Sequence, residues 1–418
     1  MKAVILAAGK GERFKGEVPK PLARLFGLPI LEHTLRALRE TIDEFIIVIS
    51  DDSKNIKDYF GDGSKLGIKI TYVDNPDPWR ENGYSLHLTR DLINEPFLIC
   101  MGDHYFERSI YSFLKEKHKE NVLFVSKINE KEEATKVYVE GDFILDIGKN
   151  IEKWNAIDTG LFICQPYIFD ITTTVAKEKE IFTISDVMKE LIKEKELRAI
   201  KIENFYWKDI DTEEDLREAE IYIQNSLVKE DDGPVSKYIN RKISSRISKF
   251  LVRYNINPNQ LTIISFIFSL MPAYLFFLTL NFLAGILTQI ASIVDGCDGE
   301  IARLKNLQSN FGAFLDSILD RYADFAIILG MILGNFSDIT LLAGLFAIIG
   351  SLMISYSAAR ADLIEKKDRF NFFLIMRRDM RLFLIMLGGI FNQILLSLLV
   401  IAVISNLTVI LRILTYRQ

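Results

Sequence analysis

The 418-residue sequence predicts two unlike parts: an α/β domain built on a Rossmann-like mixed sheet, then an all-α transmembrane domain of about six helices. Up to about Val228, charged and apolar residues are mixed, whereas from about Leu261 to Leu414 apolar stretches alternate with short polar loops. The chain is too long for one ordinary domain. Its mean hydropathy of +0.15, with 26% charged residues, fits neither a soluble nor a membrane protein alone. The average therefore hides two domains with different surroundings.

The α/β prediction rests on short apolar runs that alternate with helical patterns, which is typical of strands joined by crossover helices. The expected strands cover residues 3–6, 45–49, 68–73, 97–101 and 122–125. Ligands of such sheets bind beyond the carboxyl ends of the strands. We therefore expect the site of this domain around residues 7–13, 74–83 and 102–103.

The predicted boundary between the two parts is a polar segment that breaks the preceding helix, at residues 229–234. From Lys237 to Arg253, basic residues alternate with apolar ones at helical spacing, which favours a helix on an anionic membrane surface. An ordinary solvated helix is the alternative. Residues 1–228 are expected to form a cytosolic domain, and residues 229–258 a linker with the juxtamembrane helix. Residues 259–418 are expected to form the transmembrane domain.

The six spanning helices are expected near residues 261–280, 282–300, 311–333, 339–361, 374–391 and 393–413. Lysine and arginine are concentrated before the first helix, after Asp298, between Arg360 and Arg381, and in the tail. By the positive-inside rule, a multi-pass protein of the cell membrane is expected, with the first domain and both termini in the cytoplasm.

Charge and cysteine content exclude two other classes. The net charge is -5 and the basic residues of the first domain are not gathered on one surface, so no nucleic-acid partner is expected. Cys100, Cys164 and Cys297 match no metal spacing and lie in apolar or helical runs, which predicts buried, reduced thiols.

Four aspartates recur inside predicted spanning helices, where charged side chains are costly. They are Asp295, Asp298, Asp316 and Asp320. Spacings of three and four residues place each pair on one helix face, so two facing helices could bring four carboxylates to a common point. Such a group would repel itself unless it held divalent cations, and oxygen ligands suit magnesium, manganese or calcium. Aspartates at helix ends that contact water are the structural alternative.

The string Asp295-x-x-Asp298-Gly299-x-x-Ala302-Arg303, followed by Gly312-x-x-x-Asp316-x-x-x-Asp320, resembles the motif of the CDP-alcohol phosphotransferases. The resemblance implies a two-metal site with Mg²⁺ or Mn²⁺ on these aspartates, and Asp320 as the general base that takes the proton of the acceptor hydroxyl. Small Gly299 and Ala302, with Arg303, are expected to contact the nucleotide. The candidate ligands for a phosphate on the acceptor are Arg360, Arg377, Arg378 and Arg381. Positive-inside topology alone explains each arginine about equally well.

A glycine-rich segment follows the first expected strand, where backbone amides can surround a triphosphate. The nucleotide contacts expected there are Leu6, Ala7, Ala8, Gly9 and Gly11. Arg13 and Lys20 can offset the charge of departing pyrophosphate. With Pro19-Lys20-Pro21-Leu22, the segment resembles the NTP-transferase family that activates sugars and polyols.

This second resemblance implies roles for several further residues. Asp103 and Asp209 match the metal-binding aspartates of the family, and Asp211 either shares that duty or caps a helix. Asn82 and Ser85 lie where the family reads the base. Asp158, Thr159 and Gly160 lie where it holds the sugar or polyol, and Lys136 and Lys149 are candidates for the acceptor phosphate, with ordinary surface lysines as the alternative.

The two modules together resemble the bifunctional inositol-1-phosphate cytidylyltransferase and di-myo-inositol phosphate phosphate synthase family over nearly the whole chain. The resemblance implies that CTP and inositol 1-phosphate give CDP-inositol, which a second inositol 1-phosphate then consumes. It also implies a homodimer. The alternative enzyme is a CDP-polyol-dependent phospholipid synthase whose acceptor is a membrane-embedded lipid alcohol. The non-enzymatic alternative, a membrane-anchored nucleotide sensor, would require an inert aspartate cluster.

Overall fold

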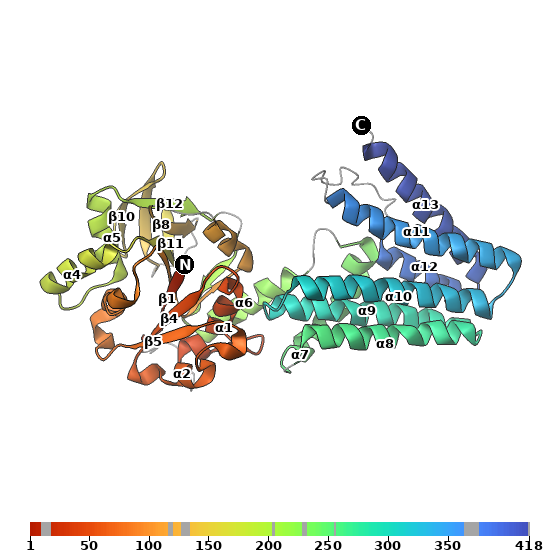
Figure 1. The fold of residues 1–418 in the computed structure, drawn as a ribbon, viewed down its shortest axis with the longest axis horizontal. Coiled ribbons are helices and arrows are strands. Elements are labelled where there is room, and N and C mark those ends of the chain that lie inside the picture. The colour runs from red at the N-terminus through yellow and green to blue at the C-terminus, as the bar shows by residue number, and fades with distance from the viewer. Residues whose placement is uncertain are drawn as a thin grey trace. The chain divides into compact units, whose positions relative to one another are not determined.

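The computed structural model describes residues 1–9, 18–115, 120–126, 134–202, 205–227, 232–254, 256–362 and 376–416. The chain divides into two compact units, residues 1–222 and 223–418. The first is an α/β unit and the second is helical (Figure 1).

Unit 1 is built on one nine-stranded mixed sheet with the strand order β5-β4-β1-β6-β11-β8-β12-β10-β9. The strands are β1 (Lys2–Leu6), β4 (Glu44–Ile49), β5 (Ile70–Asp74), β6 (Phe97–Met101), β8 (Asn121–Ser126), β9 (Lys136–Glu140), β10 (Phe143–Gly148), β11 (Ala156–Cys164) and β12 (Leu197–Lys201). Strands β5, β4, β1 and β6 are parallel, whereas β11 runs antiparallel to both β6 and β8. The five strands expected from the sequence are present, and the sheet is mixed as predicted.

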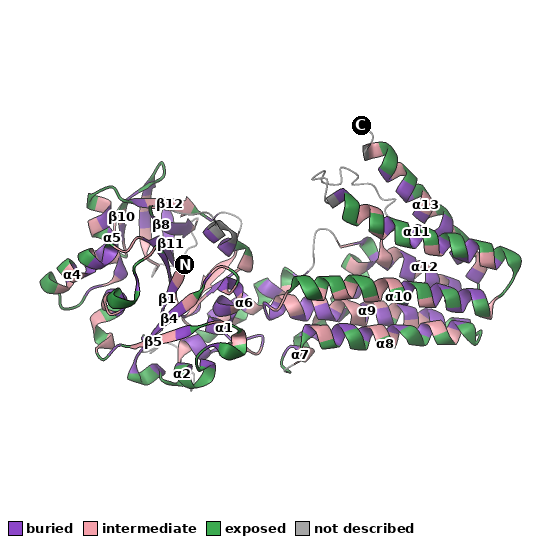
Figure 2. Cartoon of the chain, viewed as in Figure 1, coloured by how far each residue is buried: buried purple, intermediate pink, exposed green. Residues whose placement is uncertain are grey.

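Both faces of this sheet are buried, because successive side chains of one strand enter opposite clusters. In β1, Ala3 and Ile5 belong to one apolar cluster, while Val4 and Leu6 belong to the other. Figure 2 shows the central strands as buried. The helices of the unit are α1 (Ile30–Leu38), α2 (Asn55–Phe60), α3 (Glu81–His87), α4 (Ile168–Glu178), α5 (Ile184–Lys193) and α6 (Glu213–Asn225).

A short two-stranded sheet extends beyond the carboxyl end of β6. Strand β7 (His104–Phe106) pairs antiparallel with β13 (Trp207–Asp209), in a register that sets His104 opposite Asp209. A second hairpin joins β2 (Arg24–Leu25) to β3 (Leu28–Pro29). The pairing of β7 with β13 thus brings Asp209, which lies late in the sequence of unit 1, beside the loop that follows β6.

After a π-helical turn at Ser236–Asn240, the described residues of unit 2 form one shorter helix and six longer helices. They are α7 (Arg241–Leu251), α8 (Pro258–Phe277), α9 (Asn281–Leu304), α10 (Asn310–Gly334), α11 (Asp338–Asp362), α12 (Arg378–Ile390) and α13 (Ile394–Tyr416). The six longer helices fall where the sequence predicts spanning segments, although α12 begins at Arg378 rather than near residue 374. Three of them, α8, α11 and α13, are long and apolar enough to cross a membrane.

Glycines allow the longer helices of unit 2 to approach closely, as in many membrane proteins. A Cβ at Gly285 of α9 would lie 2.7 Å from the Met386 carbonyl oxygen of α12, and Gly389 of α12 lies directly against Gly285. A Cβ at Gly330 of α10 would collide with the backbone of Ala273 in α8. These contacts hold α12 against α9 and α10 against α8.

Helix α7 packs on α9 through its small polar side chains. Ser244 and Ser248 are buried there, whereas Phe250 is 58% exposed and Ile243 is 44% exposed. Ser244 donates to Oε1 of the buried Glu300 at 2.6 Å, and Arg241 binds the same oxygen at 2.9 Å. Ile243 and Phe250 therefore lie on the exposed face of this helix, whereas Ile247 and Leu251 pack against the apolar cluster of Leu261, Cys297 and Ile301. The three cysteines are buried and free, as expected.

Candidate active sites

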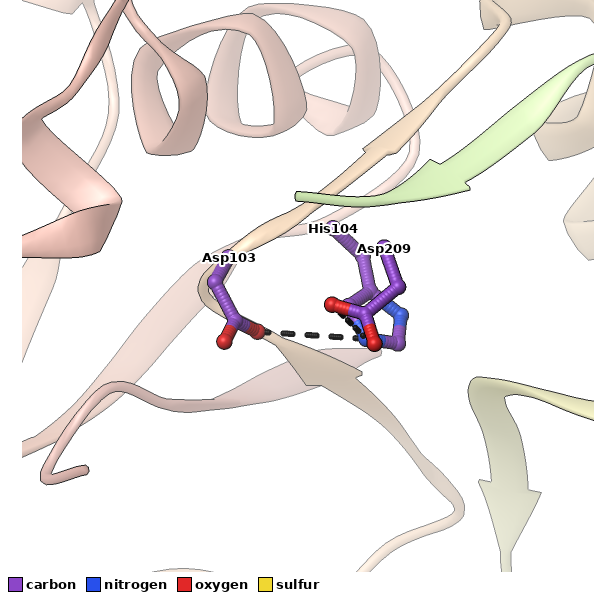
Figure 3. Close-up of side chains that lie close together, drawn as sticks. All are labelled: Asp103, His104 and Asp209. Atoms are coloured by element: carbon purple, nitrogen blue, oxygen red, sulfur yellow. Dashed lines mark ion pairs between the residues drawn. The ribbon is translucent and has the colours of Figure 1, made fainter. Parts of the chain in front are cut away.

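The first candidate site lies where β6 ends and β7 meets β13. Asp103 follows β6, His104 begins β7, and Asp209 ends β13, so the strand pairing gathers all three side chains (Figure 3). Their ligand atoms lie within 4.8 Å of one another, close enough to hold one metal ion. Nε2 of His104 is 3.3 Å from Oδ1 of Asp209 and 3.9 Å from Oδ1 of Asp103.

The charges in this first site raise several pKa values. Burial raises the pKa of Asp103, and the nearby Asp209 adds to the shift. Burial alone would lower the pKa of His104, but the carboxylates of Asp209 and Asp103 raise it to about 9. Lys20 also has a raised pKa despite its burial, because it binds Asp211 and lies 3.7 Å from Oδ2 of Asp103. Asp211 therefore holds Lys20 beside the carboxylate cluster.

A cleft of ≈ 1020 Å³ opens beside these residues and contains several predicted contacts. Asn82, Lys149, Asp158 and Gly160 line it, together with Asp103, Asp209 and Asp211. Burial raises the pKa of Asp158 to about 6. Oδ1 of Asn82 accepts from the backbone N–H of Ile184, so this side chain also caps α5.

Of the residues expected to contact the base, the polyol or its phosphate, Ser85, Lys136 and Thr159 do not line this cleft. Ser85 is only 4% exposed and its hydroxyl accepts from Asn75 at 2.9 Å, so its position does not support contact with a base. The ammonium of Lys136 lies 5.3 Å from the centre of the Trp154 ring. The Thr159 hydroxyl donates to the carbonyl of Phe124 at 2.6 Å, in the sheet interior.

The predicted triphosphate segment begins at the end of β1. Leu6, Ala7 and Ala8 are buried, and Gly9 is exposed with open space where a Cβ would be. The carbonyl of Leu6 accepts from Gly102, which ties this segment to the loop that carries Asp103. Gly11 and Arg13 lie outside the described residues.

The second candidate site is formed by facing helices of unit 2. Asp295 of α9 and Asp316 and Asp320 of α10 offer carboxylate oxygens that lie within 4.8 Å of one another. The expected fourth carboxylate, Asp298, is not in this group. Its Oδ2 accepts from the hydroxyl of Thr262 at 2.5 Å, and Oδ1 accepts from the backbone N–H of Gly299.

Two arginines of α12 neutralise the carboxylates of the second site. Arg378 binds Asp295 at 2.5 Å, Asp320 at 2.7 Å and Asp324 at 3.0 Å. Arg381 is 3% exposed, and its two terminal nitrogens bind Asp324 at 2.8 Å and the carbonyl of Met376 at 2.9 Å. Arg381 is therefore buried and paired with Asp324, and its expected contact with an acceptor phosphate stays a prediction.

The remaining predicted residues of unit 2 divide between the site and its surroundings. The side chain of Arg303 lies against Gly299, because a Cβ built at Gly299 would be 3.3 Å from Nη1 of Arg303. Nε and Nη2 of Arg303 are buried and have no hydrogen-bond partner among the described residues. Ala302, which precedes Arg303 in the chain, is half-buried. Arg377 is the N-cap residue of α12, and the exposed Arg360 binds the hydroxyl of Tyr356 at 3.3 Å, without a described contact to the carboxylates.

The comparisons with known proteins agree with this division into two sites. Residues 2–226 match the family described as nucleotidyl transferase, and residues 255–414 match CDP-alcohol phosphatidyltransferase. A protein of Aquifex aeolicus named bifunctional IPC transferase and DIPP synthase is 35% identical, with 98% of this chain and 97% of the relative aligned. The chain belongs to this bifunctional family. It is thus an enzyme with a nucleotidyltransferase domain and a CDP-alcohol phosphotransferase domain.

Other relatives of this bifunctional transferase match all or part of the chain. The protein of the same name from Archaeoglobus fulgidus is 37% identical over 93% of this chain and 78% of its own length. An archaetidylinositol phosphate synthase of Pyrococcus horikoshii is 38% identical over 40% of this chain and 87% of its own. The solved structure of the inositol-1-phosphate CTP transferase from T. maritima covers 51% of this chain and 90% of its own, with 25% identity and a TM-score of 0.47.

Sequence reasoning missed two residues of the transferase sites, His104 and Asp324. His104 directly follows the predicted metal ligand Asp103. Its position beside Asp103, with a side chain that can bind a metal, was the signal available in the sequence. Asp324 continues the four-residue spacing of Asp316 and Asp320, which places it on the same face of α10. Its pairing with two arginines of α12 could not be read from spacing along one helix.

We expect Asp324→Asn to destabilise unit 2, because Arg378 and Arg381 would lose a shared, buried counter-charge. Breaking one partner of a buried ion pair costs about 3–5 kcal/mol. The measurement is the thermal unfolding of the detergent-solubilised protein, with Asp338→Asn as a control at an exposed aspartate of α11. A normal melting temperature for Asp324→Asn would show that this pairing contributes little.

Proposed function

We propose that unit 1 joins CTP to inositol 1-phosphate, releasing pyrophosphate, and that unit 2 transfers phosphoinositol from CDP-inositol to a second inositol 1-phosphate, releasing CMP. The observation that carries this proposal is the pair of acidic clusters, one in each unit, in a chain that aligns almost completely with proteins named bifunctional IPC transferase and DIPP synthase. The product of the first site is the donor for the second.

In the first reaction, Asp103 and Asp209 would hold Mg²⁺ or Mn²⁺, and their closely spaced oxygen donors fit such a cation. The cation would neutralise the triphosphate and polarise the phosphorus under attack. Lys20, held by Asp211, would stabilise the charge of departing pyrophosphate. Oδ1 of Asn82 accepts a hydrogen bond at the start of α5, so its Nδ2 group would be the part that contacts the cytosine.

The inositol 1-phosphate of the first reaction would occupy the cleft beyond the metal. Asp158 and Lys149 both line this cleft, one able to accept from ring hydroxyls and the other able to pair with the phosphate. The pKa of about 6 leaves Asp158 mostly ionised at neutral pH, which suits a hydrogen-bond acceptor.

In the second reaction, Asp295, Asp298 and Asp316 would hold a two-metal site, with Asp320 as the base for the acceptor hydroxyl. The buried donors of Arg303, which lack partners among the described residues, could bind the CDP moiety. Arg378 reaches Asp320 and is the strongest candidate for the acceptor phosphate, with Arg377 beside it in sequence. We include Arg360 among the candidate ligands of the acceptor phosphate because it lies near the end of α11.

A lipid alcohol is the second candidate acceptor for unit 2. It is favoured by one observation, the 38% identity of this unit to an archaetidylinositol phosphate synthase. The full-length relatives named DIPP synthase favour the soluble phosphorylated acceptor instead. Incubating the protein with labelled CDP-inositol and both acceptors separates these cases, because only the lipid product partitions into an organic phase.

We further propose that unit 2 is a multi-pass domain of the cell membrane, with unit 1 and both termini cytoplasmic, and that the protein is a homodimer as its resemblance implies. Three helices satisfy the length and apolarity of membrane spans. Crosslinking in native membranes followed by mass measurement would test the dimer, and a monomer alone would contradict it.

The two activities should be separable by single substitutions. Asp103→Asn should reduce pyrophosphate release by at least about a hundredfold, because it removes a metal ligand, yet leave transfer from supplied CDP-inositol unchanged. Asp295→Asn should show the opposite pattern. Both reactions are measured on the same purified variants, and parallel loss of both activities in folded Asp103→Asn protein would contradict two independent sites.

The division of labour between Asp320 and Asp295 predicts different losses. An inositol hydroxyl is a poor nucleophile at neutral pH, so Asp320→Asn should remove most transfer while CDP-inositol and Mn²⁺ still bind. Asp295→Asn should weaken binding of both ligands. Calorimetric titration of each variant decides the matter. Equal loss of Mn²⁺ binding in both variants would assign Asp320 to the metal rather than to the proton.

Helix α7 should lie on the cytoplasmic leaflet, because Ile243 and Phe250 are exposed on the same helix as Lys242 and Arg246. Single cysteines at residues 242 and 246 should react with a membrane-impermeant reagent only from the cytoplasmic side of sealed vesicles. A cysteine at the buried Ser248 provides the unreactive control. Labelling of residues 242 and 246 only from the outside would reverse the proposed topology.

A further inference from the structure

The proposed chemistry of unit 1 leaves one side chain of its acidic cluster without a task. The imidazole of His104 lies beside Asp209 and faces Asp103 (Figure 3), and its ligand atom is within 4.8 Å of theirs. It is held there by the register of β7 with β13, not by a flexible loop. Its Nε2 lies 3.3 Å from Oδ1 of Asp209 and 3.9 Å from Oδ1 of Asp103.

The hydrogen bond on the far side of the ring fixes which nitrogen faces the carboxylates. Nδ1 of His104 lies 2.9 Å from the carbonyl oxygen of Thr159, which can only accept, so Nδ1 carries a proton and donates. In the neutral ring this leaves the lone pair on Nε2, toward Asp103 and Asp209. Metal-binding histidines commonly donate their other ring N–H to a backbone carbonyl in this way.

The distances fit three ligands around one cation. Two ligands at about 2.1 Å from a metal, and at right angles, are about 3 Å apart. The separations of Nε2 from the two Oδ1 atoms, 3.3 Å and 3.9 Å, therefore require side-chain movements of less than about 1 Å. Lys20 faces Oδ2 of Asp103, at 3.7 Å, and so leaves Oδ1 for a shared cation.

Gly160 provides the space that the ring of His104 occupies. Its φ is +73°, in the left-handed region that favours glycine. A Cβ at this position would lie 2.8 Å from both Cε1 and Nδ1 of His104. Thr159 and Gly160, expected from the sequence to contact the polyol, thus place the imidazole, one through its carbonyl and the other through its missing side chain.

We propose that His104 is the third protein ligand of the divalent cation in the nucleotidyltransferase site, an inference that rests on the proposed function. First-row transition-metal ions, of which Mn²⁺ is the weakest binder, accept an imidazole nitrogen more readily than Mg²⁺, which keeps to oxygen ligands. The site should therefore prefer Mn²⁺ over Mg²⁺ more strongly than two carboxylates alone would. The competing role is an imidazolium that pairs with Asp209 and repels a cation.

Pulsed electron paramagnetic resonance of bound Mn²⁺ tests this coordination directly. The full-length protein, purified without a histidine tag, should show coupling to an imidazole ¹⁴N, which His104→Gln removes. The dissociation constant for Mn²⁺ at this site should rise by at least about tenfold in that variant, with a smaller change for Mg²⁺. Mn²⁺ in unit 2 adds no ¹⁴N coupling, since its described cluster contains carboxylates alone.

A matched control is His87→Gln, because His87 binds the Thr172 hydroxyl at 2.9 Å and lies outside the cluster. It should retain both the coupling and the affinity. Thermal unfolding of each variant reports whether unit 1 is folded, and His104→Asn replaces His104→Gln if the latter fails this check.

The outcomes separate this inference from the proposed function. If Asp103→Asn removes one bound Mn²⁺ while the unmodified protein shows no ¹⁴N coupling, the metal site stands and the role of His104 is wrong. Tighter Mn²⁺ binding in His104→Gln would also overturn it, in favour of the imidazolium. If Asp103→Asn leaves the number of bound Mn²⁺ ions unchanged, the proposed metal site itself fails.

Discussion

The neutralisation of closely spaced carboxylates is the constraint on which both sites depend. Like charges a few ångströms apart in a partly dry environment repel strongly, so each group needs a cation nearby. In unit 2 this requirement is met across helices, because Arg378 contacts carboxylates from α9 and α10 together. The cost of burying Asp324 is offset by Arg378 and Arg381 at once. The arrangement of α12 against α9 and α10 is therefore an electrostatic necessity as well as a matter of packing.

Unit 1 meets the same constraint with different chemistry. Its carboxylates come from strand ends rather than helix faces, and a lysine and a histidine lie among them. Lys20 is fixed by Asp211, which lies two residues after Asp209. One short backbone segment therefore places both Asp209, a candidate metal ligand, and Asp211, the partner of Lys20. A strand pair of three residues is enough to set this geometry because main-chain hydrogen bonds determine its register.

The parts that could be predicted from sequence are those that local periodicity determines. Alternation and apolar runs located the strands of the parallel core and the six long helices, and the spacing of Asp316 and Asp320 gave their shared helix face. Contacts across elements could not be obtained in this way. Ser85 contacts Asn75, Arg381 contacts Asp324, and Asp298 contacts Thr262. In each case the partner lies on another element, and a single sequence contains no signal for that pairing.

The segment that enters unit 2 is fastened to α12 and α9, which contribute Arg378 and Asp295 to the second site. Asp379 accepts from the backbone N–H of Ser236 at 2.9 Å, and any side chain at Gly233 would collide with its carboxylate.

On the neighbouring turn, Arg241 binds both Asp232 and the buried Glu300 of α9. Asp379 follows Arg378 directly, and Glu300 lies on α9 within five residues of Asp295 and Asp298. These contacts therefore hold the backbone from which the proposed metal ligands and their counter-ion project. Removing Arg241 would take away the ion-pair partner of the buried Glu300, so the segment of residues 232–241 and the second site are energetically coupled.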